Sequence, residues 1–245
     1  MGDILNNQNL NQGFSNYAFT QQFGCQNTAA VSQQADPGAG LPNQTFIIQD
    51  GNSNEMTNAQ IGSGNLLLGF QLGYQVNDHH QDQGNHFGWE NGNGNSLGYK
   101  HKANENMVIG ERNKLTIQQA GNDNGVLAVQ QGNDHLIVAE QKGNNNYLTI
   151  LQKGTNNSVS GYVQENSDGG ILFESISQVG ENLHLSATDV SRSKSNGNVF
   201  NQSGVNLSLE VNNGLINTVG GIEINQTGRD MMVKVDQSFF SFPMQ

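Results

Sequence analysis

The 245-residue chain has one cysteine, three prolines, one tryptophan and few charged side chains, which make up 13% of its residues. Cys25 alone cannot form an internal disulfide framework. No run of about 18 apolar residues is present, so the sequence predicts no membrane-spanning helix. Lys and Arg number 10 against 21 Asp and Glu, and this acidic balance argues against binding nucleic acid through its phosphates.

The first sixteen residues also lack the basic and apolar regions of a secretory signal peptide. From the residues alone, two interpretations remain open. Either the chain stays in the cytoplasm, or the sequence is that of a mature or re-engineered chain whose signal has been removed.

What the chain has in abundance is side-chain amide. There are 37 Asn and 26 Gln residues, which together make up about a quarter of the sequence. This composition is typical of two kinds of chain: a disordered prion-like polypeptide, or a stacked β structure with ladders of amide hydrogen bonds.

An eleven-residue repeat, N-x5-Q-x-G-x-x, favours the stacked structure. The central copies have glutamines at Gln119, Gln130, Gln141 and Gln152, and glycines at Gly121, Gly132, Gly143 and Gly154. They begin at Asn113, Asn124, Asn146 and Asn157, and His135 occupies the remaining Asn position.

The same register recurs towards both ends of the chain. The further asparagines are Asn16, Asn27, Asn43, Asn54, Asn65 and Asn196. The further glutamines are Gln22, Gln33, Gln49, Gln60, Gln71 and Gln202, with weaker copies ending at Gln178, Gln226 and Gln237. The further glycines are Gly24, Gly51, Gly62, Gly73, Gly180, Gly204 and Gly228.

Each unit reads as one short strand and one turn. Between the two amides every second residue is apolar, as at Leu115 and Ile117, and a period of two is the signature of a strand. The glycine after each glutamine suits a turn because it tolerates a positive φ. Because all units are alike, we expect a parallel coil in which identical residues stack, rather than antiparallel hairpins.

The predicted fold is therefore all-β: a β-solenoid with two strands in each rung of about 22 residues, stacked in cross-β fashion. The Asn and Gln side chains would then hydrogen-bond along the axis. We expect one domain, 1–245, with irregular insertions at about 36–42, 78–102 and 166–170. Neither terminus reads as a capping helix, so exposed strand edges predict head-to-tail association.

Several side chains outside this pattern are of types that can form sites. His79, His80, His86 and His101, with nearby carboxylates, are interpreted as polar loop residues rather than metal ligands. No pattern indicates a catalytic, cofactor-binding or metal site, and we expect a protein that is not an enzyme.

A row of apolar residues is expected to point away from the core: Leu127, Val129, Leu136, Val138, Tyr147 and Leu151. Lateral bundling of fibres, a locally relaxed strand phase, or coverage by 78–102 would each account for it.

The repeat resembles the curlin repeat of bacterial curli. The run from Asn113 through Gln119, Gly121 and Asn124 to Gln130 follows that pattern position by position. The resemblance implies a secreted functional amyloid of the biofilm matrix, located outside the cell or at its surface. It also implies three partners: further copies of the chain, a nucleator subunit and an outer-membrane secretion pore. From the acidic charge balance and the lack of a long apolar run, we expect no nucleic-acid partner and no membrane insertion.

Two other functions stay open at this point. A monomeric β-solenoid could bind a surface, a glycan or ice, although only Thr116 and Thr149 approach the flat threonine row of an ice binder. A phage or appendage fibre would require a separate trimerising head, and no such domain is visible in the sequence.

Overall fold

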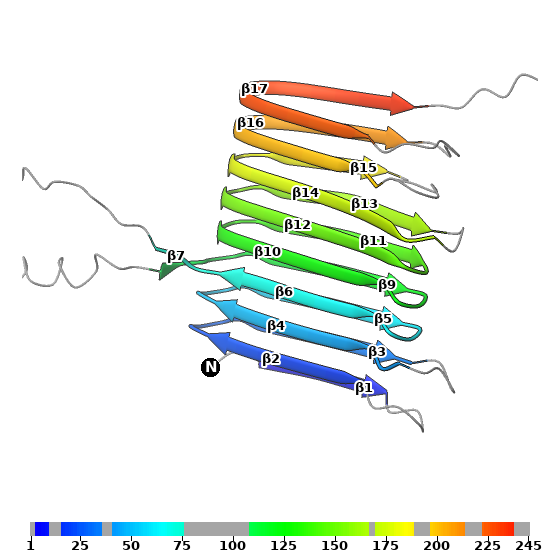
Figure 1. Cartoon of the computed structure of the whole chain (residues 1–245). Helices are drawn as coiled ribbons and strands as arrows, with labels where there is room; N and C mark the ends of the chain where they lie inside the picture. Colours follow the sequence, from blue (N-terminus) through cyan, green and yellow to red (C-terminus); the bar gives the residue numbers. More distant parts are fainter. Residues whose placement is uncertain are drawn as a thin grey trace, which may run out of the picture.

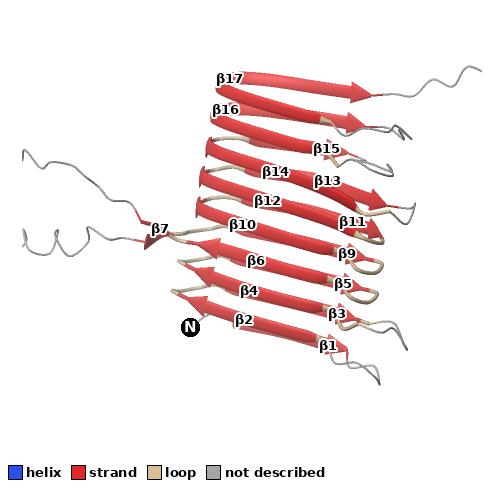
Figure 2. Cartoon of the chain, in the orientation of Figure 1, coloured by secondary structure: helices blue, strands red, loops and turns tan. Residues whose placement is uncertain are grey.

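The computed structural model describes residues 3–9, 16–35, 41–75, 108–166, 170–188, 197–213 and 222–237. Every regular element in these ranges is a β-strand (Figure 2). The strands are β1 (Asp3–Asn9), β2 (Tyr17–Phe23), β3 (Thr28–Gln34), β4 (Gln44–Asp50), β5 (Glu55–Ile61), β6 (Leu66–Leu72), β7 (Tyr74–Gln75), β8 (Val108–Ile109), β9 (Lys114–Ala120), β10 (Gly125–Asn133), β11 (Leu136–Gly143), β12 (Asn146–Thr155), β13 (Ser158–Asn166), β14 (Leu172–Glu181), β15 (His184–Thr188), β16 (Val199–Asn213) and β17 (Glu223–Gln237).

The chain winds as a coil whose turns lie one above another (Figure 1). Alternate strands build two walls. The first wall holds β2, β4, β6, β10, β12, β14 and the N-terminal halves of β16 and β17. The second wall holds β1, β3, β5, β9, β11, β13, β15 and the C-terminal halves of β16 and β17. Because β16 and β17 each run around the bend, hydrogen bonds join 15 strands into one parallel sheet.

This arrangement confirms the predicted β-solenoid with two strands in each turn. Pairing is in register, so repeat positions stack on themselves; for example, Gln130 pairs with Gln152 on the neighbouring strand. Stacked glutamines are 22 residues apart in the regular turns, and 27 or 26 residues apart where the chain makes a longer excursion. Extra residues that fall in a bend therefore lengthen the bend without shifting the register of the walls.

The longest excursion separates Gln71 from Gln130, which are 59 residues apart yet stacked. It begins and ends with the short antiparallel pair of β7 and β8, beside the coil in Figure 1. Of the expected insertions, 78–102 lies wholly outside the described residues. Residues 36–40 and 167–169 of the other two also lie outside them.

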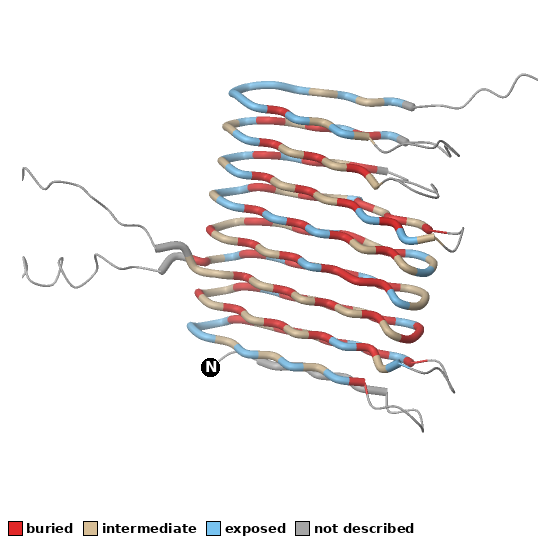
Figure 3. The backbone as a smooth tube through the Cα atoms, viewed as in Figure 1, coloured by how far each residue is buried: buried red, intermediate tan, exposed pale blue. Residues whose placement is uncertain are grey.

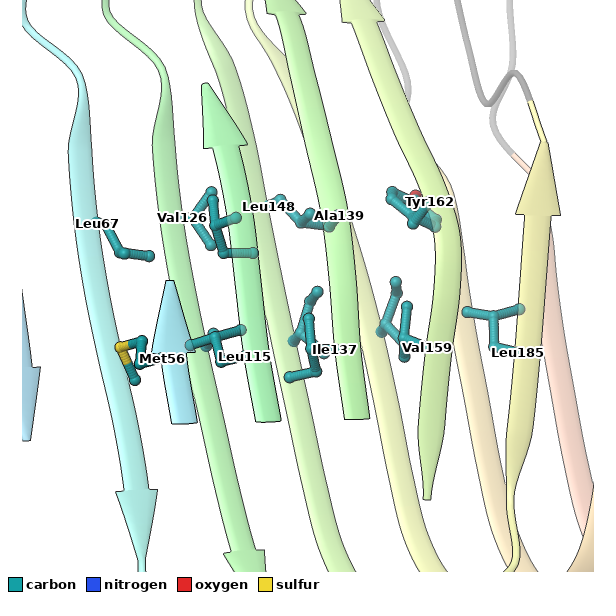
Figure 4. Close-up of a cluster of buried hydrophobic side chains, with 14 of the residues drawn as sticks. Met56, Leu67, Leu115, Val126, Ile137, Ala139, Leu148, Val159, Tyr162 and Leu185 are labelled. Atoms are coloured by element: carbon teal, nitrogen blue, oxygen red, sulfur yellow. The ribbon is translucent and has the colours of Figure 1, made fainter. Parts of the chain in front are cut away.

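The core is the thin space between the walls. Burial alternates along the wall strands whose side chains are described, except where β16 and β17 pass around the bend (Figure 3), as the period of two requires. Aliphatic side chains from both walls, such as Leu67 and Leu148 from the first and Leu115 and Ile137 from the second, meet there (Figure 4). All four are at most 2% exposed.

Candidate functional site

Glutamines form a continuous ladder along the first wall. In each step the side-chain amide nitrogen of one glutamine donates to the side-chain oxygen of the glutamine in the next turn, over 2.6–3.0 Å. The ladder runs through Gln22, Gln49, Gln71, Gln130, Gln152, Gln178, Gln202 and Gln226. Every amide points the same way, so the ladder has a direction: it donates towards the C-terminal end.

A shorter ladder lies in the second wall and has the same direction. It runs through Gln33, Gln60, Gln119, Gln141 and Gln164, with steps of 2.7–2.9 Å. The fixed eleven-residue register missed Gln164, which lies 23 residues after Gln141. A β-bulge in β13 adds one residue to this turn. Gly161, inside the bulge with φ +68°, was the available sequence signal.

Beyond Gln22, the second hydrogen of the ladder amides ties the two walls together. Gln130 Nε2 donates to the carbonyl oxygen of Lys114 at 3.0 Å, and Gln141 Nε2 donates to that of Gly125 at 3.1 Å. Gln130 and Gln141 therefore each have both amide hydrogens and the oxygen paired while fully buried. This is the condition under which a buried polar group does not destabilise the core.

The asparagines bond differently from the ladder that the sequence suggested. The side-chain oxygen of Asn113 accepts from the backbone N–H of His135, its counterpart in the next turn, at 3.1 Å. The side-chain nitrogen of Asn113 donates to the carbonyl oxygen of Gly132 at 2.7 Å. We call this pair of hydrogen bonds, from the side chain to the backbone of the next turn, a clasp. Equivalent clasps are made by Asn27, Asn54, Asn65, Asn124 and Asn157. Asn43 makes the same pair of bonds, and Asn16 accepts from the backbone N–H of Asn43.

Because these clasps hold the bend of one turn against the next, the asparagines position the bends rather than form a second amide stack. Among these repeat asparagines, Asn146 makes a hydrogen bond between side chains: its nitrogen donates to Asn124 Oδ1 at 2.9 Å.

His135 replaces an asparagine in this role. Its Nδ1 accepts from the backbone N–H of Asn157 at 3.3 Å, and its Nε2 lies 3.1 Å from the carbonyl oxygen of Gln131. The two contacts together require a neutral ring with the proton on Nε2. Burial lowers the pKa of His135 below its ordinary value.

The bends have a fixed backbone pattern that depends on glycine. Gly24, Gly51, Gly62, Gly121, Gly132, Gly143, Gly154, Gly180, Gly204 and Gly228 all have positive φ. A Cβ on Gly204 would overlap the carbonyl oxygen of Gly228 in the next turn, and the other stacked bends repeat this contact. Gly73 instead lies between β6 and β7, where the chain leaves the solenoid.

Just before the repeat asparagine, the bends also hold non-glycine residues in the left-handed region. Examples are Asp123, Asn145 and Asn156, with φ of 54–57°. Asn and Asp tolerate this conformation best among side chains. Arg112, also at positive φ, shows that the position was not readable from residue type alone.

Two predicted positions cannot be placed. Asn196 lies outside the described residues. Gln237 is the last residue of β17, and only its backbone is described.

A buried polar cluster was missed by the sequence reasoning. Glu174, 4% exposed, occupies an inner position of β14 that pairs with Leu148 below it. Its carboxylate accepts from Tyr162 Oη at 2.6 Å and from Asn198 Nδ2 at 2.7 Å. Burial and the nearby carboxylate raise the pKa of Tyr162 well above its ordinary value. The available sequence signal was Glu174 itself, a charged residue at a strand position where the apolar–polar alternation places side chains in the core.

The two ends of the solenoid differ from its middle. Core-facing side chains of β17, such as Ile224, Val233 and Val235, are only partly buried, whereas the equivalent Phe200, Leu209 and Val211 of β16 are at most 1% exposed. At the other end Ala18 of β2 is likewise partly buried. Among the described residues, no element covers the outer edge of β2 or β17.

The first-wall ladder is open at both of these ends. The side-chain oxygen of Gln22 accepts no hydrogen bond from the described residues, while its nitrogen donates to Gln49. Gln226 accepts from Gln202, and its nitrogen donates to the carbonyl oxygen of Ser208, which leaves one amide hydrogen unused within the described part of the chain. Within the described ranges, the ladder therefore ends in an unused acceptor at Gln22 and an unused donor at Gln226.

Within the described ranges, no three His, Cys, Asp or Glu side chains are grouped closely enough to hold a metal ion. The same part of the chain contains no helix with the length and apolar character needed to cross a bilayer.

The fold and the ladders define a β-solenoid whose turns are joined by stacked amides and whose end strands, β2 and β17, each have one edge unpaired among the described residues. Residues 110–143 match the family model described as the curlin associated repeat. This match confirms the resemblance to curlin-repeat proteins on the most regular part of the sequence. Searches of curated proteins and of solved structures found no significant match to the chain.

Proposed function

We propose that this protein is a structural subunit of an extracellular, curli-like amyloid fibre of the biofilm matrix. The observation that carries the proposal is the directional ladder from Gln22 to Gln226, with an open acceptor at one end and an open donor at the other. In this account copies of the chain stack head to tail, and the ladder passes from one copy to the next.

The geometry of the ends supports this polarity. When β17 of one copy meets β2 of the next in the register of the inner turns, Gln226 faces Gln22 and Gly228 faces Gly24. A head-to-head contact would place acceptor against acceptor, and a tail-to-tail contact would place donor against donor. Free strand edges template the addition of another chain, and each addition also buries the partly exposed core residues of β17.

The remaining parts of the proposal come from the curlin repeat. A subunit of this kind is secreted through an outer-membrane pore and begins its fibre on a nucleator subunit. The protein acts as a building element and performs no reaction.

The experiment compares Gly228→Ala with Gly204→Ala. The two glycines have φ of +140° and +144°, so alanine is strained about equally at both positions. At Gly204 the added Cβ overlaps the next turn of the same chain. At Gly228 the nearest atom among the described residues is Met231 Sδ at 3.1 Å, so in this account the overlap with a neighbouring turn arises when another copy stacks on β17.

We expect the Gly228→Ala chain to fold but to lose seeded elongation, followed by thioflavin fluorescence, whereas the Gly204→Ala chain loses stability. Gly228→Ala monomers that fold and elongate at the wild-type rate would contradict the stacking of β17 on β2. A wild-type chain that stays a soluble monomer and never seeds would favour a monomeric binding module instead.

A further inference from the structure

The outer surfaces of the two walls differ in chemistry. On the second wall the outward side chains pair as ions between turns, as in Lys114 with Glu55 at 3.0 Å and Lys234 with Glu210 at 3.3 Å. On the first wall, from β2 to β14, outward positions are mainly aromatic and aliphatic. The outward charges on these strands are Asp50, Lys153 and Glu181, all towards one margin. We call this surface the apolar face.

Aromatic rings follow one another along the apolar face. Tyr17 and Phe46, on adjacent strands, have ring centroids 5.4 Å apart, and Tyr147 and Phe173 stack at 4.9 Å. Phe173 is 63% exposed and Tyr17 is 48% exposed. Large exposed apolar patches on a folded chain mark interaction surfaces.

The structure also settles one alternative from the sequence. Leu127 and Leu151 point outward from the first wall, each 37% exposed, so the strand phase is not relaxed there. Val138, in the same expected row, is 36% exposed but lies on the second wall. The row is therefore divided between the two surfaces, and its larger part belongs to the apolar face.

We infer that the apolar face binds the apolar face of a second copy of this chain, so that two solenoids pack wall to wall. Charge favours this occupant, because the chain carries a net charge of −11 and two such chains repel least where ionisable groups are few. Flat sheets pack face to face about 10 Å apart with their side chains interdigitated.

The area of the apolar face also favours a second copy of the chain as its partner. Six strands about 4.8 Å apart, each about 23 Å long, give a flat area of roughly 600 Å² per copy. Pairing two copies would therefore bury about 1,200 Å², which is at the lower limit of stable interfaces. In a fibre the faces of successive copies add, so a weak contact between single copies becomes a continuous seam between filaments.

The test pairs two double variants of the full-length chain. Leu127→Thr with Leu151→Thr alters the apolar face. Ile61→Thr with Val138→Thr alters positions of the second wall that are 54% and 36% exposed, against 37% for each leucine. Threonine retains strand propensity while removing apolar surface. For each chain, mass per unit length of the fibres is measured by electron microscopy and elongation by seeded thioflavin fluorescence.

We expect paired filaments for the wild type and for Ile61→Thr with Val138→Thr. For Leu127→Thr with Leu151→Thr we expect mass per length to fall about twofold, to single filaments, with elongation within twofold of the wild type. Single filaments for the wild type, as would result if another segment of the chain covered the face, would overturn the inference. So would an equal loss of pairing in both variants, or retained pairing in Leu127→Thr with Leu151→Thr.

The inference rests on the proposed function for its filaments, but it can fail or hold separately. If the wild type forms no filaments, the proposed end-to-end stacking fails. Sedimentation velocity of the soluble chain then measures whether two copies pair through the apolar face. A wild-type dimer that Leu127→Thr with Leu151→Thr converts to a monomer supports the inference, and a wild-type monomer overturns it.

Discussion

The side-chain nitrogen of Gln202 donates to the side-chain oxygen of Gln226 at 2.9 Å. The two residues lie on neighbouring turns of the solenoid and are 24 residues apart in sequence. The same bond joins Gln130 to Gln152 at 3.0 Å over 22 residues. The contact is thus preserved while the length of the chain between its members changes. Because the bends vary in length, they do not determine the register of the strands. The glutamine pairs and the backbone hydrogen bonds between strands determine it.

Replacing a ladder glutamine should destabilise the protein far more than replacing its outward neighbour. Gln119→Leu removes the acceptor of Gln60 and the donor to Gln141 inside the core, and we expect a loss of about 2–4 kcal/mol in the free energy of unfolding. Gln118 is the preceding residue of the same strand, exposed on the outer surface, and Gln118→Leu should change stability by less than about 0.5 kcal/mol. Denaturant unfolding of the unassembled chains measures both, and equal losses would contradict the role of the ladder.

His135 should make stability depend on pH. Its pKa is lowered by burial in the folded chain, so the unfolded chain binds a proton more readily. The stability that the neutral ring contributes is present above the unfolded pKa, near 6.5, and decreases as the pH falls from there towards the folded pKa.

His135→Asn restores the repeat residue, whose oxygen can accept from Asn157 without titrating. We expect this variant to lose the part of the pH dependence that lies below about 6.5. Melting temperatures measured between about pH 7.5 and 5 test this, and an unchanged pH profile in the variant would rule out His135 as the source.

The buried cluster around Glu174 should be sensitive to loss of a single hydroxyl group. Tyr162→Phe leaves the carboxylate with one donor fewer inside the core, and we expect it to cost about 1–3 kcal/mol. Tyr147→Phe is the control, because Tyr147 lies partly exposed on the outer surface of the first wall. Chemical unfolding of both chains provides the comparison, and a neutral Tyr162→Phe substitution would show that the contact stabilises nothing.

The stability of the protein should depend strongly on the residue type at the left-handed position of each bend. Asp123 has φ +56° and an exposed side chain, so Asp123→Gly should be nearly neutral. Asp123→Val places a β-branched residue in that region and should cost about 1–2 kcal/mol. Thermal unfolding of the two variants measures the difference, which should vanish if the bend rearranges freely.

Sequence reasoning predicted the solenoid and many of the stacked positions because the eleven-residue period directly records which residues share a place in successive turns. Gln119 and Gln141 can be paired in this way from their spacing alone. Gln164 cannot, because the bulge at Gly161 breaks the period by one residue. The bonding of the asparagines was not predictable either, since composition does not tell whether an amide meets another amide or a bend carbonyl.

The difference between the two outer surfaces depends on which wall each repeat joins. Successive repeats alternate between walls, so Leu127 and Val138, eleven residues apart, occupy the same repeat position on opposite sides. The eleven-residue period taken alone puts both residues in one row. The predicted rung of two strands assigns them to opposite walls, and the strand pairing confirms this assignment.

The central claim is that copies of this chain stack end to end with the ladder continuing across the junction. Electron cryo-microscopy of fibres grown from the wild-type chain, with helical reconstruction, tests it most directly. The account predicts strands spaced about 4.8 Å apart along the whole axis, with β17 of one copy beside β2 of the next and Gln226 facing Gln22. Fibres in which these two edges do not meet, or a chain that forms no fibre under seeding, would contradict it.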